Sequence, residues 1–120
     1  MQTVRDTMAA TVNSNVWISF NHSFSLFTLG SNGTLVLEGT DSSGAKTIGI
    51  YINDYTTGAR TYTIAGTGTD TASYTNLGVL HHVSSGTLQV VAVSDSFVQG
   101  KFTLTADSFS IINGVFNYKQ

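Results

Sequence analysis

Apolar residues alternate with Thr, Ser and Gly along most of the chain. The alternation is clearest at Thr47–Ile52 and at Thr61–Ile64, where large apolar side chains occupy every second position. Successive side chains of a strand point to opposite faces, so a two-residue repeat indicates half-buried strands. No window shows the sustained spacing of three to four residues, with caps, that a helix requires. The pattern therefore predicts an all-β protein.

Turn-forming residues divide the chain at short, regular intervals. Ser31-Asn32-Gly33 is a strong hairpin signal, because Asn-Gly tolerates the positive φ angles of a tight turn. Asp41–Gly44 predicts a second turn, and Asn53–Gly58 predicts a loop. The first two strands are either separate or one long strand bent near Ser14. The predicted strands cover residues 8–13, 15–22, 24–29, 34–39, 46–53, 60–65, 72–75, 79–83, 87–94, 97–106 and 109–118.

With the first two ranges taken as one bent strand, the pattern predicts an antiparallel β-sandwich or flattened barrel of about nine to ten strands with mostly meander connections. A chain of 120 residues is the size of one domain and buries one core. Without a linker or a change of composition, we expect an N-terminal extension at residues 1–7 and a single β domain at residues 8–120. The sequence contains no cysteine, which excludes disulfides and thiolate metal sites.

The charge and hydropathy of the chain limit the classes of partner that the protein is expected to bind. Five basic and seven acidic residues give a net charge of −2, and the basic residues are scattered. The basic residues form no continuous positive surface that could neutralise phosphates, so nucleic acid is not an expected partner. No apolar run approaches the roughly 20 residues of a membrane span. A surface of Thr, Ser, Asn and Gly is typical of exported domains. We therefore interpret Met1 as a start added to a mature segment, with a cytosolic protein as the alternative.

The ionisable residues show no catalytic or metal-binding pattern. His81 and His82 are adjacent on a predicted strand and would face opposite ways, so no metal site is expected. A calcium site at Asn53-Asp54 or Asp70 is the weaker interpretation, because the spaced ligands of a dedicated loop are missing. The acidic residues expected to serve turns are Asp41, Asp54, Asp70, Asp95 and Asp107, which leaves Glu38 as the strand-borne acid.

The sequence also lacks the signatures of common hydrolases. No pair of carboxylates marks a glycosidase, no Gly-x-Ser-x-Gly elbow is present, and the spacing suggests no histidine–aspartate pairing. We therefore expect no catalytic residue, no cofactor and no metal, and the protein is not expected to be an enzyme.

Aromatic side chains are the better functional lead, because an exposed ring offers a rigid apolar face to a sugar. Tyr55 lies in a predicted loop and is the best candidate for exposure. With Tyr51 and Asp54 it forms the predicted ligand-binding set. Trp17 lies in the most apolar early segment and is expected to be buried.

Six short segments follow one another in a recognisable order. They are Ala10–Trp17, Thr61–Ile64, Ser73–Thr75, Gly86–Val90, Gly100–Phe102 and Ile111–Phe116. In this order they resemble a family of small uncharacterised exported, lipoprotein-type β domains of Bacteroidota, although Ser14 stands where that family has glycine. The resemblance implies a sandwich or barrel at the outer-membrane surface or in the periplasm, with a lipid anchor on a precursor. It brings no catalytic residues.

Together these observations predict a non-enzymatic exported β domain for binding or adhesion at a bacterial cell surface, with a glycan or an envelope protein as partner. One alternative is a structural subunit that self-assembles by strand addition into an oligomer or filament, donating the segment from Met1 to Val12. Another is a viral fibre or decoration domain, which would explain a native Met1.

Overall fold

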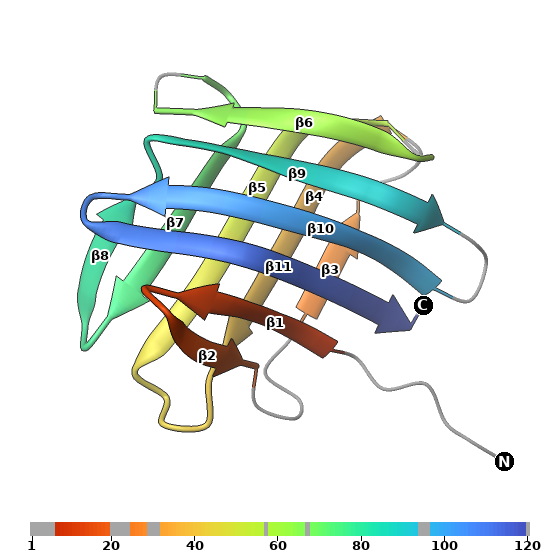
Figure 1. Ribbon diagram of the computed structural model, residues 1–120. Coiled ribbons are helices and arrows are strands. Elements are labelled where there is room, and N and C mark those ends of the chain that lie inside the picture. The colour runs from red at the N-terminus through yellow and green to blue at the C-terminus, as the bar shows by residue number, and fades with distance from the viewer. Residues whose placement is uncertain are drawn as a thin grey trace, which may run out of the picture.

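The computed structural model describes residues 7–19, 25–28, 32–56, 58–66, 68–93 and 97–119. These residues form eleven strands in two open antiparallel sheets, one in front of the other (Figure 1). The prediction of an all-β antiparallel sandwich is confirmed. The strands of one sheet run across those of the other, as in orthogonally packed sheets (Figure 1). No helix in the described part of the chain is long and apolar enough to cross a membrane.

The front sheet has six strands in the order β2-β1-β11-β10-β9-β6. Pairing of β1 with β11 brings the two ends of the domain together, with Met8 opposite Phe116. Thr7 already belongs to β1, so the predicted extension stops one residue earlier, and residues 1–6 lie outside the described part. The strand bounds are β1 Thr7–Val12, β2 Asn15–Ile18, β6 Arg60–Ala65, β9 Ser85–Val93, β10 Phe97–Ala106 and β11 Phe109–Lys119.

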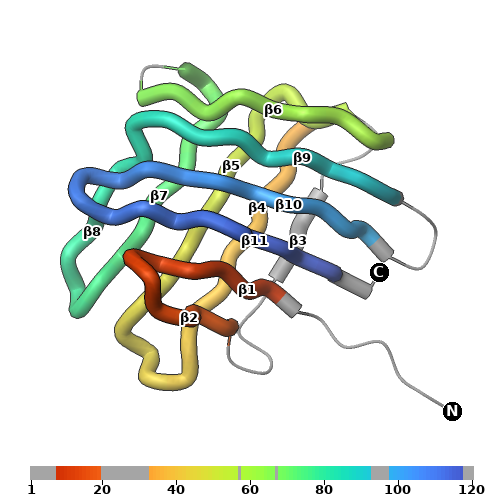
Figure 2. The backbone as a smooth tube through the Cα atoms, viewed as in Figure 1, coloured from red at the N-terminus to blue at the C-terminus, as the bar shows by residue number. Residues whose placement is uncertain are grey.

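The back sheet has five strands in the order β3-β4-β5-β7-β8. Most connections join neighbouring strands, as predicted, and those from β2 to β3, β5 to β6, β6 to β7 and β8 to β9 change sheet. Figure 2 shows the chain passing from the back sheet to the front sheet between β8 and β9. The strand bounds are β3 Ser25–Thr28, β4 Asn32–Thr40, β5 Lys46–Thr56, β7 Thr71–Asn76 and β8 Val79–His82.

Alternating apolar residues of both sheets fill the space between them. On β5, Ile48, Ile50 and Ile52 are fully buried, and from the front sheet Leu88 and Leu104 are equally inaccessible. This is the two-residue repeat of the sequence, now seen as one inward and one outward row on each strand. Trp17 is buried, as expected, with 3% of its surface exposed.

Two Gly-x-Phe segments on neighbouring strands fit each other reciprocally. Gly100 lies opposite Phe116, and Phe102 lies opposite Gly114. A Cβ atom on either glycine would overlap the opposite phenylalanine ring. Each ring therefore occupies the space that a glycine leaves free, which gives a packing reason for both motifs.

The predicted hairpin turn at Asn32-Gly33 differs from the structure. Asn32 and Gly33 lie within β4 and pair with Thr56 and Tyr55 of β5, so the hairpin turn is not at Asn32-Gly33. The β3–β4 connection itself falls at residues 29–31, outside the described part, as do the predicted strand residues 20–22 and Ser94 and the turn residue Asp95. A two-residue turn at Asn13-Ser14, with φ of 47° and 70°, separates β1 from β2.

A β-bulge changes the end of β5. Gly33 pairs with Tyr55 and Leu35 pairs with Ile52, so Asn53 and Asp54 together face the single residue between the two β4 partners. The extra residue shifts the alternation by one position. The strand consequently continues to Thr56 instead of ending at Asn53.

Candidate functional site

The structure overturns the expectation that Tyr55 is exposed. Tyr55 belongs to β5 and only 3% of its surface is exposed. The bulge at Asn53-Asp54 turns its side chain to the inner face, where its ring stacks on Tyr62 with 6.2 Å between the centroids. A ring that packs in the core offers no face to a sugar, so we do not propose Tyr55 as a ligand platform.

Tyr51 lies on the opposite face of the same strand. Its hydroxyl donates a hydrogen bond to Glu38 Oε2 at 2.9 Å, and its ring covers Gly49. Burial and the neighbouring Glu38 carboxylate raise the pKa of Tyr51. Because Tyr51 and Tyr55 point to opposite faces of one sheet, they do not form a single binding surface.

Asp54, the third predicted ligand residue, is exposed and lies beside Asp70. The two carboxyl groups are hydrogen-bond partners, and Asp70 also accepts the Asn53 backbone N–H at 2.9 Å. Burial, followed by the hydrogen bond to Asp54, raises the pKa of Asp70. The described residues contain no group of three or more His, Asp or Glu side chains that could hold a metal. The carboxyl pair thus falls short of the ligand set that calcium requires.

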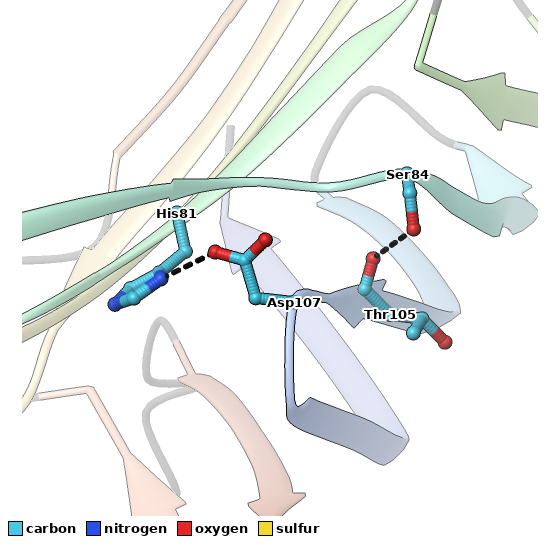
Figure 3. Close-up of polar contacts among 4 residues, drawn as sticks. All are labelled: His81, Ser84, Thr105 and Asp107. Carbon is cyan, nitrogen blue, oxygen red and sulfur yellow. Dashed lines mark hydrogen bonds and ion pairs between the residues drawn. The ribbon is translucent and has the colours of Figure 1, made fainter.

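Sequence spacing gave no sign of a histidine–aspartate pair, yet the fold makes one. His81 Nδ1 lies 2.6 Å from Asp107 Oδ2, joining β8 of the back sheet to the β10–β11 turn of the front sheet (Figure 3). The Ser84 hydroxyl is directed at Thr105, to whose carbonyl it donates at 3.3 Å (Figure 3). The serine is therefore not aligned for nucleophilic chemistry with this pair.

The strongest candidate site is a hollow of about 260 Å³ between the two sheets at one end of the sandwich. We refer to it as the sandwich-end hollow. Strands of the back sheet, the first hairpin of the front sheet and the start of β11 meet there. Its lining consists of Val12, Asn13, Asn15, Val16, Trp17, Lys46, Tyr74, Asn76, Leu77 and Phe109.

Aromatic rings form the inner walls of this hollow. Tyr74 and Phe109 meet edge to face, with 4.9 Å between their centroids. The indole N–H of Trp17 donates to the Lys46 carbonyl at 3.1 Å, which fixes the ring across the gap between the sheets. Burial, with a smaller contribution from the Asp41 carboxylate, raises the pKa of Tyr74, so its hydroxyl stays neutral.

Two polar residues occupy the last inward row of the back sheet. Lys46 is two residues before the fully buried Ile48, so the strand alternation places Lys46 on the inner face. Asn76 is its direct partner across β5 and β7, and Tyr74 is the partner of Ile48. A lysine and an asparagine thus stand side by side where the core would otherwise continue with apolar residues.

Neither side chain has a partner among the residues that the structure describes. The Oδ1 atom of Asn76 is buried and accepts no hydrogen bond from them. The Lys46 side chain forms no ion pair with any residue that the structure describes. Leaving a buried acceptor unpaired costs about 1–3 kcal/mol. A donor group of a molecule in the hollow, either water or a ligand, would satisfy this acceptor.

The rim of the hollow carries exposed apolar side chains. Val16 is 78% exposed and Leu77 is 74% exposed. Leu77 also has a φ of 53° in the two-residue turn between β7 and β8. The left-handed region costs a residue with a Cβ roughly 1–2 kcal/mol, and glycine or asparagine is the usual choice. Neither backbone preference nor burial explains leucine at this position.

The sequence contains part of the signal for this site. The alternation of Lys46 with Ile48, Ile50 and Ile52, and of Asn76 with Ala72 and Tyr74, already assigns both polar residues to inward rows. Which turns and which aromatic rings meet them depends on how the two sheets pack, and no local pattern encodes that. Asp41 does serve its turn as predicted, since its Oδ1 accepts the Ser43 hydroxyl at 2.8 Å.

We found no match to the chain among protein-family models, curated proteins or solved structures.

Proposed function

We propose that this protein is a non-enzymatic binding domain that takes a sugar residue of a glycan into the sandwich-end hollow. The carrying observation is the inward-facing pair of Lys46 and Asn76 beside a hollow whose accessible apolar surface comes from Phe109, Val16 and Leu77. Ligand sites combine apolar and aromatic walls with a few polar groups that fix orientation. The hollow has this composition.

Size and chemistry favour a sugar ring over a larger molecule. Pockets for drug-sized ligands measure roughly 300–1,000 Å³, and the hollow measures about 260 Å³. A single sugar ring has an apolar face for Phe109 and the apolar rim, and an edge of hydroxyl groups for the Asn76 amide. The surface rich in Thr, Ser and Asn, together with the resemblance to exported domains, supports a setting at a bacterial cell surface.

The test uses Trp17 as an internal reporter, because it is the sole tryptophan of the chain and lines the hollow. Monosaccharides are titrated into ¹⁵N-labelled protein while the indole N–H resonance is followed. We expect saturable shifts of this resonance and of the Asn76 side-chain amide. A panel of neutral, acidic and acetylated sugars that leaves both resonances unmoved would refute the proposal.

A further inference from the structure

We infer that the sugar bound in the sandwich-end hollow is acidic, a hexuronate whose carboxylate pairs with the ammonium group of Lys46. The inference rests on the proposed function and adds the chemical class of the ligand. Lys46 is the one charged residue among those that line the hollow. Its ammonium group forms no ion pair with any residue that the structure describes, although the Asp41 carboxylate also acts on the hollow at Tyr74.

The nearby acidic residue, Asp41, makes its hydrogen bonds within the β4–β5 turn. Asp41 Oδ1 accepts the backbone N–H of Lys46 at 3.2 Å and the Ser43 hydroxyl at 2.8 Å, so it closes the β4–β5 turn. At the same time, the Lys46 carbonyl accepts the Trp17 indole N–H. The backbone of Lys46 is thus held on both sides, while its side chain is left for another anion.

A protective role does not account for this lysine. Inward-pointing charges commonly discourage edge strands from pairing with other chains. Lys46 lies on β5, which is the middle strand of its sheet and is paired on both sides with β4 and β7. Because β5 has no free edge, a charge at this position does not prevent pairing with another chain.

The surroundings strengthen an ion pair with a carboxylate. Lys46 is half-buried, and apolar walls reduce the screening that water gives to exposed pairs. The amide of Asn76 stands directly opposite, and no hydrogen bond to a described residue holds it in place. It is free to turn toward a carboxylate or a neighbouring hydroxyl. A carboxylate alone would leave Asn76 Oδ1 without a donor, whereas a hexuronate also supplies hydroxyl groups that can donate to it.

The inference is tested by comparing sodium glucuronate, glucuronamide, glucose and sodium acetate at equal ionic strength, with the Trp17 indole N–H as the readout. Glucuronamide has the shape of glucuronate without its charge. We expect glucuronate to bind at least about tenfold more tightly than the two neutral sugars, consistent with a charge-assisted contact. We expect acetate to bind more weakly than glucuronate, because it lacks the ring.

Two variants test whether Lys46 supplies the positive charge that binds the carboxylate. Lys46→Met keeps the aliphatic stem, and we expect it to lower glucuronate affinity to that of glucuronamide. Lys101→Met removes a lysine from the outer side of β10, away from the hollow, and should leave binding unchanged. Because glucuronamide tests the charge on the unaltered protein, the inference remains falsifiable if Lys46→Met does not fold.

The outcomes separate the two proposals. Equal affinities for glucuronate, glucuronamide and glucose would overturn the acidic class and leave the binding function standing. Equal affinities for acetate and glucuronate would reveal a simple anion site and also overturn the inference. If none of the four compounds moves the indole resonance, the acidic class is refuted, and the wider panel of sugars decides the binding function.

Discussion

At the scale of single residues, Leu77 has two features that lower the stability of the folded protein. Its backbone is left-handed and its side chain is largely exposed at the rim of the sandwich-end hollow. We predict that Leu77→Asn raises the free energy of unfolding by about 1 kcal/mol. The same change should weaken sugar binding several-fold, because it removes apolar surface from the rim. Denaturant titration and the Trp17 resonance measure the two effects.

Ser14 provides the matched control. It has a φ of 70° in the β1–β2 turn and does not line the hollow. Ser14→Gly should stabilise the protein by a similar mechanism and leave sugar affinity unchanged. If both variants alter affinity equally, or if Leu77→Asn alters none, the rim has no part in binding.

The Asp54–Asp70 pair predicts a stability that depends on pH. The pKa of Asp70 is raised above its ordinary 3.8, so the folded state holds a proton that the unfolded chain releases. This contribution is fully present below the unfolded pKa and is lost as the pH rises through the folded pKa. Between those two values, wild-type stability should therefore fall as the pH increases.

Asp54→Asn tests this coupling. An amide donates to the Asp70 carboxylate without adding charge, so the variant should be more stable than the wild type at neutral pH and should show a flatter pH dependence. Urea titrations from pH 4 to pH 8 measure this. An unchanged slope in both Asp54→Asn and Asp70→Asn would show that the carboxyl pair is not linked to folding.

At the scale of elements, the reciprocal Gly-x-Phe pairing of β10 and β11 predicts a specific sensitivity. A methyl group at Gly100 would meet the Phe116 ring, so Gly100→Ala should destabilise the protein by about 1–3 kcal/mol. Gly68→Ala is the control, since a Cβ there has no neighbour closer than 3.9 Å and its change should stay within about 0.5 kcal/mol. Thermal and denaturant unfolding of both variants measure this difference in stability. Equal stabilities would contradict the packing argument.

The elements also show what a sequence pattern can and cannot reveal. Alternation located the strands well, because inward and outward rows are a property of each strand by itself. It misplaced Tyr55, because the bulge at Asn53-Asp54 is defined by pairing with β4, a strand distant in the chain. The His81–Asp107 contact was not predicted for a similar reason, because it joins residues of two different sheets. Lys46 was assigned no role because a charged residue is usually a surface residue.

At the scale of the whole molecule, the two sheets close over a common core and leave an aromatic, partly polar hollow at one end. The proposed sugar site draws residues from both sheets, whereas the set predicted from the sequence lay on β5 alone. Self-assembly by strand addition, a viral fibre role and the exported setting remain predictions from the sequence.

The most direct test of the account is the location of a bound sugar. Intermolecular nuclear Overhauser effects between sugar protons and protein protons report contacts within roughly 5 Å, the range in which aromatic rings pack on a ligand. With glucuronate bound, we predict such effects to the Phe109 ring and to the methyl groups of Val16 and Leu77, which line the hollow. Effects confined to residues outside the sandwich-end hollow, or the absence of any from a saturated sample, would contradict it.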